Sequence, residues 1–208
     1  LDEVVDAARI AVKDLPQPPR IAIIGAENDD AILAAKRANA EGRYRVARFS
    51  LFGASAEINE IAYEMDLVLD GRNYEVVDTD EPLADALRAI EEGRVDLLMK
   101  GRLKTEEILR GVFGYLKRAG RLVPGQVVSH VLVADIPVRD KLLLVTDAAV
   151  NPYPDEERRV QILENALRVA RGLNLTRPEV AVISAIENVN QSVESSVVAA
   201  RIAKRFEG

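Results

Sequence analysis

The sequence predicts an α/β protein built of mostly parallel sheets flanked by helices. Short β-branched runs alternate with longer amphipathic stretches along the chain, and this alternation is typical of parallel strands joined by helical crossovers. Hydrophobic residues make up 48% of the 208 residues and charged residues 30%, which is enough apolar surface for a packed core. A polar segment ends at Pro124-Gly125, where strand-like runs begin again. We therefore predict two domains, residues 1–124 and 125–208.

The first domain should contain four strands, each a short apolar run that ends at a glycine or a polar turn. These strands are predicted at residues 21–24, 45–49, 75–77 and 96–99. Asn28 and Asp80 are suited to cap the helices after the first and third strands, and Pro82 fits a first turn. Gly42 and Gly93 mark the ends of those two helices. Further helices are expected at residues 54–65 and 105–118.

The second domain should contain three strands and two helices. The strands are predicted at residues 127–133, 142–145 and 180–183. Pro154 opens the first of the two helices and Gly172 ends it. Ser184, followed three residues later by Glu187, fits a capping box before the final helix.

Charge and composition exclude several classes of protein. The chain carries 28 Lys and Arg against 34 Asp and Glu, a formal net charge of −6, which argues against broad electrostatic binding to nucleic acid or to a membrane surface. It has no cysteine and one histidine, which excludes a zinc–thiolate site, a thiol nucleophile and a multi-histidine metal site. No apolar run reaches the roughly 20 residues of a membrane-spanning helix, and no secretory signal is recognised. We expect a cytoplasmic protein without a bound metal.

A cluster of cations follows the fourth predicted strand. Ligands of open parallel sheets bind beyond the carboxyl ends of the strands, and here Lys100, Arg102 and Lys104 fall within five positions of an acidic chain. Gly101 would let the backbone approach a ligand closely, and Thr105 could cap the next helix beside it. The loop suits a phosphate group, and a solvated basic turn is an equal alternative.

Four further residues are candidates for catalysis or binding, each with a structural alternative. Ser129 and His130 are neighbours on a predicted strand, so their side chains point to opposite faces, and a hydrogen-bonded structural role is the alternative for the histidine. Asp147 follows the strand at residues 142–145 and can accept a proton, orient a ligand or hydrogen-bond its own turn. Glu187 follows the last predicted strand, where the capping role is the alternative.

Several short motifs occur in an order that is specific as a set. They are Leu98-Met99-Lys100-Gly101, Ser129-His130-Val131, the stretch from Thr146 to Pro152 with Pro154, Gln161-Ile162 with Asn165-Ala166, and the stretch from Pro178 to Ser184 with Glu187. In this order they resemble the phosphate acetyltransferase and phosphate butyryltransferase family over about residues 20–204. The Met-Lys-Gly and Ser-His-Val forms look more like the butyryl branch.

The resemblance implies a reversible transfer of a short acyl group between coenzyme A and inorganic phosphate. Family members bind acyl-CoA and phosphate together, use no metal or bound cofactor, and form homodimers or larger homo-oligomers. The resemblance also implies two α/β domains with a cleft between them, where the basic loop would hold phosphate. The predicted catalytic residues are Asp147, Ser129 and His130, and the predicted phosphate- or substrate-binding residues are Lys100, Gly101, Arg102, Lys104, Thr105, Asn151 and Glu187.

The sequence departs from the family pattern in one respect. Family members continue into a segment with an Asp-Gly-Pro sequence and, near its end, a Ser-Arg pair and an aspartate that serve the phosphate and the coenzyme A thiol. This chain stops at Phe206-Glu207-Gly208, so we expect the second domain to be incomplete. The alternative function is a truncated, non-catalytic module that binds coenzyme A or a phosphorylated ligand. A dehydrogenase-like relative is disfavoured because the dinucleotide-binding fingerprint is absent.

Overall fold

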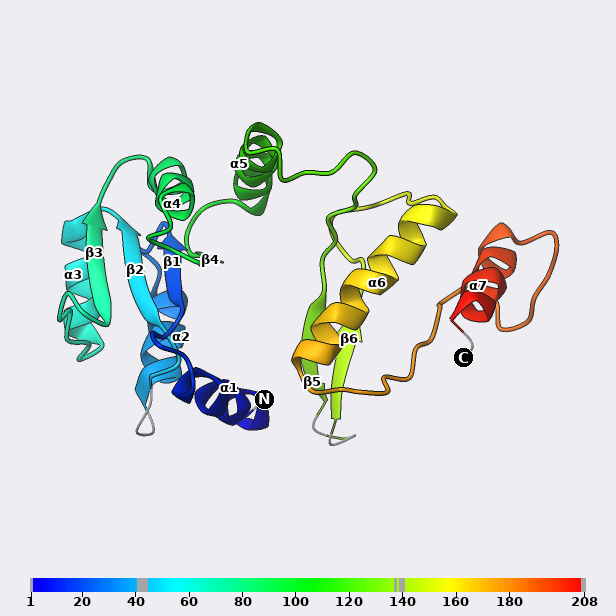
Figure 1. Cartoon of the computed structure of the whole chain (residues 1–208), viewed down its shortest axis with the longest axis horizontal. Helices are drawn as coiled ribbons and strands as arrows, with labels where there is room; N and C mark the ends of the chain where they lie inside the picture. Colours follow the sequence, from blue (N-terminus) through cyan, green and yellow to red (C-terminus); the bar gives the residue numbers. More distant parts are fainter. Residues whose placement is uncertain (1, 41–44, 137, 139–140, 207–208) are drawn as a thin grey trace. The chain divides into compact units, whose positions relative to one another are not determined.

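The computed structural model describes residues 2–40, 45–136, 138 and 141–206 (Figure 1). The chain divides into two compact units, Leu1–Val123 and Pro124–Gly208. The helices and strands described in the first unit are α1 (Asp2–Lys13), β1 (Arg20–Ile24), α2 (Asp29–Ala40), β2 (Arg48–Gly53), α3 (Ser55–Glu64), β3 (Tyr74–Asp78), α4 (Pro82–Glu91), β4 (Leu97–Lys100) and α5 (Thr105–Arg118).

The strands of the first unit form one parallel sheet in the order β3-β2-β1-β4. The chain moves outward from β1 through β2 to β3, and then crosses back to place β4 on the other side of β1 (Figure 1). This reversal creates a switch point between β1 and β4, where Ile24 is the register partner of Lys100. Open α/β sheets bind their ligands beyond the carboxyl ends of strands at such a point. The prediction of a mostly parallel α/β fold is confirmed.

Helices cover both faces of this sheet, which explains why its strands read as nearly continuous apolar runs. On one face, Ile32 of α2 and Ile58 of α3 join a buried cluster with Ile23 of β1. On the other face, Ala86 of α4 packs in a second cluster with Phe52 of β2. The two clusters fix the sheet, and with it the loops at its carboxyl edge.

Two helix starts test the predicted caps. The Asn28 side chain accepts a hydrogen bond from the Ala31 N–H at 2.8 Å, so the cap of α2 is confirmed. The predicted cap at Asp80 is wrong, because Glu81 occupies the N-cap position of α4. The Thr79 hydroxyl accepts from the Glu81 N–H at 3.0 Å, which fixes the turn before α4, but no side chain caps the helix itself.

Other boundaries of the first unit differ in detail from the predictions. Thr105 is the first residue of α5 and not its cap, since Lys104 occupies the N-cap position and makes no side-chain cap. Gly93 takes a φ of +68° at the end of α4, as its predicted role requires. The second strand was predicted at residues 45–49, whereas β2 starts at Arg48 and continues to Gly53. Its buried residues continue past the predicted end. Gly42, the predicted end of α2, lies outside the described residues.

The second unit contains β5 (Leu132–Ile136), β6 (Lys141–Val145), α6 (Glu156–Gly172) and α7 (Glu194–Arg205) among the described residues. The two strands form an antiparallel hairpin, which is an exception to the parallel pairing of the first unit. The Asp155 carboxylate caps α6 by accepting from the Arg158 N–H at 2.9 Å. Gly172 is the last residue of α6, as predicted. None of the described helices has the length and apolar character needed to cross a membrane.

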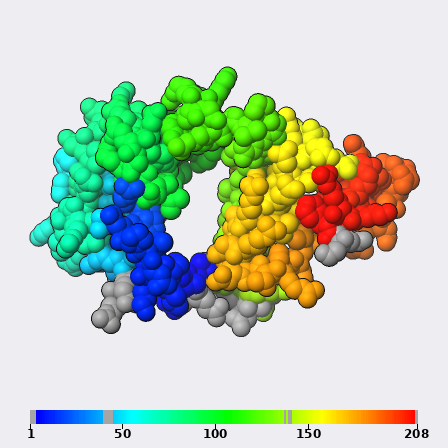
Figure 2. Space-filling view, viewed as in Figure 1, coloured from blue at the N-terminus to red at the C-terminus, as the bar shows by residue number. Residues whose placement is uncertain are grey.

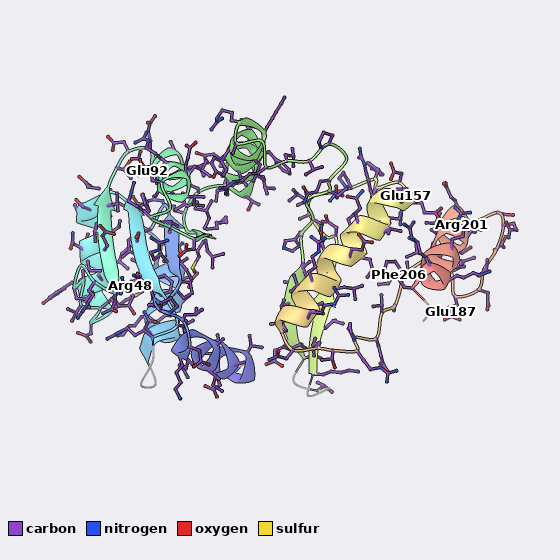
Figure 3. All side chains as sticks on the ribbon, viewed as in Figure 1. Arg48, Glu92, Glu157, Glu187, Arg201 and Phe206 are labelled. Carbon is purple, nitrogen blue, oxygen red and sulfur yellow. The ribbon has the colours of Figure 1, made fainter. Side chains whose placement is uncertain are left out.

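Helix α7 packs against α6 through a small core edged by ion pairs. Figure 2 shows the red atoms of α7 against the yellow atoms of α6. The Arg201 guanidinium donates to Glu156 at 2.6 Å, and the Arg205 guanidinium donates to Glu157 at 3.1 Å. Figure 3 labels Glu157 and Arg201 on the two helices. The buried residues of this core are Val160, Val198 and Ile202.

Two predictions for the strands of the second unit are wrong. Residues 180–183 form no strand, and the Ile183 side chain is 85% exposed. The predicted strand at residues 127–133 enters a ladder only at Leu132. An apolar run fits the pattern of a strand, but a strand also needs a neighbouring ladder, and no described segment provides one here.

The predicted capping box before the final helix is also wrong. Helix α7 begins at Glu194, well beyond Ser184 and Glu187. The Ser184 hydroxyl lies 3.2 Å from the Ser195 hydroxyl, so it contacts α7 from the side. The sequence spacing was correct for a box, but the chain between Glu187 and α7 does not form the helix that a box would begin.

Candidate functional site

The basic loop after β4 lies at the switch point of the first sheet and is bonded to the turn after β1. The Gly101 N–H donates to the Ile24 carbonyl at 3.0 Å, and the Arg102 N–H donates to the Gly25 carbonyl at 2.7 Å. Two backbone hydrogen bonds therefore hold the two loops together where the topology predicts a ligand site.

Gly101 is required by this contact between the loops. A Cβ atom at position 101 would lie 2.1 Å from the Gly25 carbonyl oxygen, far inside van der Waals contact. The sequence suggested that Gly101 allows close approach of the backbone to a ligand. Within the described residues, the close approach that it allows is to the turn after β1.

The three cations of the loop are exposed to solvent. The Arg102 guanidinium forms an ion pair with Glu57 of α3 at 3.0 Å, and the Lys100 ammonium donates to the Gly101 carbonyl at 3.2 Å. Thr105 and Lys104 are also exposed. Exposed cations at a helix start can contact an anion from solvent, and the ion pair holds one of them in place.

An open cavity of about 700 Å³ lies between α4 and α5 and reaches the basic loop through Leu103. This volume lies within the roughly 300–1,000 Å³ of small-molecule pockets. Leu83, Leu87 and Tyr115 give it an apolar wall. Its charged lining residues are Asp80, Glu81, Arg88, Glu91, Glu107, Arg110 and Arg118. The cavity thus combines an apolar wall with charged groups of both signs, next to the cationic loop.

In the second unit, the Asp147 carboxylate organises the turn that follows β6. One oxygen accepts from the N–H groups of Ala149 and Val150, both at 2.9 Å. The other accepts from the Asn151 amide at 2.6 Å and from the His130 backbone N–H at 3.3 Å. Asp147 therefore makes the turn interaction that the sequence left as one of its alternatives.

These hydrogen bonds also set the acidity of Asp147. Partial burial alone would raise the pKa of its carboxyl group. The bonds from Val150, Ala149, Asn151 and His130 favour the charged form more strongly, so the pKa of Asp147 lies below its ordinary value. A carboxylate with a lowered pKa is a weak proton acceptor.

Ser129 and His130 lie beside this turn on an extended segment. The Thr146 hydroxyl donates to the His130 carbonyl at 2.6 Å. Both backbone polar groups of His130, its N–H and its carbonyl, are therefore bonded to side chains of residues 146–147. The His130 Nδ1 atom is buried and has no hydrogen-bond partner among the described residues. Buried polar atoms are rarely left unpaired, which makes this nitrogen a candidate contact for a ligand.

Two residues of α6 bond the extended segment 127–129, and sequence reasoning did not assign them this role. The Asn165 amide donates to the Ser129 hydroxyl and to the Val127 carbonyl, both at 3.0 Å. The Gln161 carbonyl oxygen accepts from the Val127 N–H at 3.0 Å. The available signal was their spacing, because amides four positions apart share one face of a helix.

The structure brings together some of the predicted site residues and leaves others apart. His130, Asp147 and Asn151 are joined by hydrogen bonds into one cluster, and Asn151 also donates to the Val128 carbonyl at 2.9 Å. Ser129 is the neighbour of Val128 and His130 in the chain, and its hydroxyl is bonded to Asn165. The predicted residues from Lys100 to Thr105 belong to the loop of the first unit. Glu187 is exposed on the segment between α6 and α7 (Figure 3) and takes no part in the hydrogen bonds of the cluster.

Comparisons with known proteins agree on one family. The family model described as "Phosphate acetyl/butaryl transferase" matches residues 75–207. The chain is 37% identical over 189 residues to the "Probable phosphate butyryltransferase" of Bacillus subtilis (strain 168). The aligned region is 89% of this chain and 60% of that protein. It is 38% identical over 160 residues to a phosphate acetyltransferase of Rhizobium meliloti. That aligned region is 76% of this chain and 49% of the relative.

Solved structures point the same way. The crystal structure of a branched-chain phosphotransacylase from Enterococcus faecalis V583 matches with a TM-score of 0.69 and 26% identity, over 91% of this chain and 64% of that one. In length, the chain spans 60% of the Bacillus relative named above. Since the family model covers more than half of the residues, the chain belongs to the phosphate acetyl/butaryl transferase family.

Proposed function

We propose that this protein transfers a short acyl group between coenzyme A and inorganic phosphate. The observation that carries the proposal is the 37% identity to a probable phosphate butyryltransferase across 89% of the chain. The basic loop at a sheet switch point and the polar cluster around Ser129 and Asp147 support it, because the reaction needs an anion site and hydrogen-bond donors for a developing oxyanion.

The proposed reaction balances without an oxidant, a reductant or a bound cofactor. A phosphate oxygen attacks the carbonyl carbon of the thioester, and a tetrahedral oxyanion forms. The new C–O bond is retained, the C–S bond breaks, and sulfur leaves with its electron pair. The proton carried by hydrogen phosphate ends on the coenzyme A thiol, so the products are an acyl phosphate and free coenzyme A.

The residues divide into three proposed roles. The loop of Lys100, Gly101, Arg102, Lys104 and Thr105 holds phosphate through its cations at the start of α5. The Ser129 hydroxyl and the His130 ring face the phosphate or the thioester carbonyl. Asp147 and Asn151 hold that segment in place, since the Asp147 carboxylate already accepts four hydrogen bonds. Glu187 stays a predicted substrate contact.

The acyl group is proposed to be of butyryl size. The Met99-Lys100-Gly101 and Ser129-His130-Val131 motifs support this choice, whereas the butyryl and acetyl relatives match at nearly the same identity, 37% and 38%. The protein is further proposed to act in the cytoplasm as a homodimer or larger homo-oligomer, with acyl-CoA and phosphate as its partners and no resident cofactor.

The test is release of coenzyme A by the purified protein from acetyl-, butyryl- and hexanoyl-CoA, with and without inorganic phosphate. The proposal expects release that depends on phosphate, formation of an acyl phosphate that hydroxylamine traps, and the highest kcat/KM for butyryl-CoA. Release without phosphate would identify a thioesterase and overturn the proposal. A preference for acetyl-CoA would overturn only the choice of branch.

The second candidate is a non-catalytic module that binds coenzyme A or a phosphorylated ligand. The lowered pKa of Asp147 favours it, because the one carboxylate in the cluster is then a poor base. Calorimetric binding of coenzyme A, together with no phosphate-dependent release, would identify this module.

A further inference from the structure

The Asn165 side chain on α6 has a defined orientation. Its amide group lies 3.0 Å from the Val127 carbonyl oxygen, which can only accept a hydrogen bond. The NH₂ end of the amide must therefore face the 127–129 segment. The same nitrogen lies 3.0 Å from the Ser129 Oγ, and its second hydrogen points to that oxygen.

This orientation decides what the Ser129 hydroxyl can do. An amide NH₂ group has hydrogens to donate and no lone pair to offer, so Ser129 Oγ is the acceptor in this contact. The hydroxyl proton must then point away from Asn165. No described residue accepts a hydrogen bond from it, whereas the hydroxyl is only partly buried. Ser129 is left with one proton to donate outward.

We propose that Asn165 is a positioning residue that holds the Ser129 hydroxyl as a hydrogen-bond donor to the substrate oxygen. This inference rests on the proposed function, in which that oxygen belongs to phosphate or to the thioester carbonyl. A donor fixed before the reaction stabilises a developing oxyanion without reorganisation. Without Asn165, no hydrogen bond among the described residues would fix the direction of the hydroxyl proton, and the donor would no longer be oriented before the reaction.

Gln161 provides a matched control on the same face of α6. It lies one turn before Asn165, and its carbonyl oxygen accepts from the Val127 N–H at 3.0 Å. No hydrogen bond links Gln161 to Ser129 among the described residues. In Gln161→Glu, the new carboxylate can still accept from Val127. In Asn165→Asp, the new carboxylate can only accept, so the Ser129 proton turns toward it and away from the substrate.

The experiment compares Asn165→Asp with Gln161→Glu, which each add one negative charge to the same helix. We expect Asn165→Asp to lower kcat for phosphate-dependent coenzyme A release at least about tenfold, since removal of one oxyanion donor costs roughly 100- to 1,000-fold. Gln161→Glu should stay within about threefold of the unaltered protein, less than the 1.4 kcal/mol of a tenfold change. Thermal melting shows whether both variants fold.

The variants Ser129→Ala and Ser129→Ala/Asn165→Asp separate positioning from a general structural role. If Asn165 acts through Ser129, the double variant loses no more kcat than Ser129→Ala alone, because the two losses are coupled. Losses that multiply, or equal losses in Asn165→Asp and Gln161→Glu, would overturn the inference.

If the proposed function is wrong, the experiment gives a result that differs from a failure of the positioning role alone. The unaltered protein would then show no phosphate-dependent release, and the same four variants would be compared by the calorimetric affinity for inorganic phosphate and for coenzyme A. Weaker binding in Asn165→Asp than in Gln161→Glu, with no further loss on the Ser129→Ala background, would support the positioning role. Equal affinities, or no binding at all, would overturn it.

Discussion

The His130 backbone N–H donates to the Asp147 carboxylate at 3.3 Å, and the His130 ring takes no part in this bond. The aspartate therefore fixes the chain that carries the histidine and leaves the ring nitrogen Nδ1 unpaired among the described residues. A Ser-His-Asp relay would need the ring itself to bridge the serine and the carboxylate. Asp147 thus holds the backbone of the segment and does not form a Ser-His-Asp relay.

The first prediction concerns the pH dependence of stability. A carboxyl group whose folded pKa is lowered contributes stability that is present above its unfolded pKa of about 3.9 and is lost as the pH falls through the folded pKa. Asp147→Asn should remove this contribution and lower the free energy of unfolding at pH 7 by about 1–3 kcal/mol, because hydrogen bonds to a charged group are lost. Urea unfolding from pH 2 to 7 measures it. The two curves should approach each other as the pH falls below about 4 and through the lowered pKa of Asp147; curves that stay parallel would contradict the prediction.

The second prediction assigns phosphate to the basic loop. Lys100→Ala and Arg102→Ala should each raise the KM for phosphate, and the double variant should lose at least about tenfold in kcat/KM, or 1.4 kcal/mol. Stability should hardly change, because the exposed Arg102–Glu57 ion pair is worth less than about 1 kcal/mol. Arg94→Ala is the matched control, since it removes an exposed cation paired with Glu92 away from the cavity. Steady-state kinetics with the phosphate concentration varied tests the prediction, and an effect of Arg94→Ala equal to that of the loop variants would refute it.

The third prediction concerns the contact between the loops. Gly101→Ala should destabilise the protein by about 1–3 kcal/mol, because its Cβ would overlap the Gly25 carbonyl and force the backbone apart. Gly172→Ala is the control, since a methyl group added there would meet nothing within 4 Å among the described residues, and it should be neutral or slightly stabilising. Thermal melting of the two variants gives the comparison. Similar melting temperatures would show that the loops can separate at little cost.

The fourth prediction concerns what holds α7 to α6. Ile202 is only 2% exposed, so Ile202→Ala should cost about 2–5 kcal/mol. Arg201→Ala breaks an ion pair with Glu156 whose side chains are 55% and 37% exposed, and should cost less than about 1 kcal/mol. Hydrogen exchange of the α7 amides reports both changes. Faster exchange in Arg201→Ala than in Ile202→Ala would mean that the ion pairs, and not the core, retain the helix.

Local signals in the sequence predicted the parts of the fold that depend on local chemistry. The Asn28 cap and the start of α5 at Thr105 follow from residues a few positions apart. The strand at residues 180–183 failed because pairing depends on a distant ladder, which the pattern of one segment does not contain. The antiparallel pairing of β5 and β6 was missed for the same reason.

The candidate site also contains residues that local sequence signals predicted and residues whose role depends on how the helix packs. Ser129, His130 and Asp147 were found because they follow or form strand-like runs, and Asn151 was implied by the family resemblance. The structure joins His130, Asp147 and Asn151 by hydrogen bonds. The partners of residues 127–129 on α6 were not assigned, because their relation to Ser129 arises only when the helix packs beside the 127–129 segment. Sequence alone named the polar groups but did not show which of them donate and which accept.

The backbone bonds between the turn after β1 and the loop after β4 have a thermodynamic consequence. The Gly101 and Arg102 N–H groups are bonded to the turn after β1, so folding already orders the first part of the loop. Most loops lose conformational entropy when they close on a ligand, and this loss weakens the affinity. Here much of that entropy is lost once, during folding, so the temperature dependence of anion binding should report charge and hydration and little loop ordering.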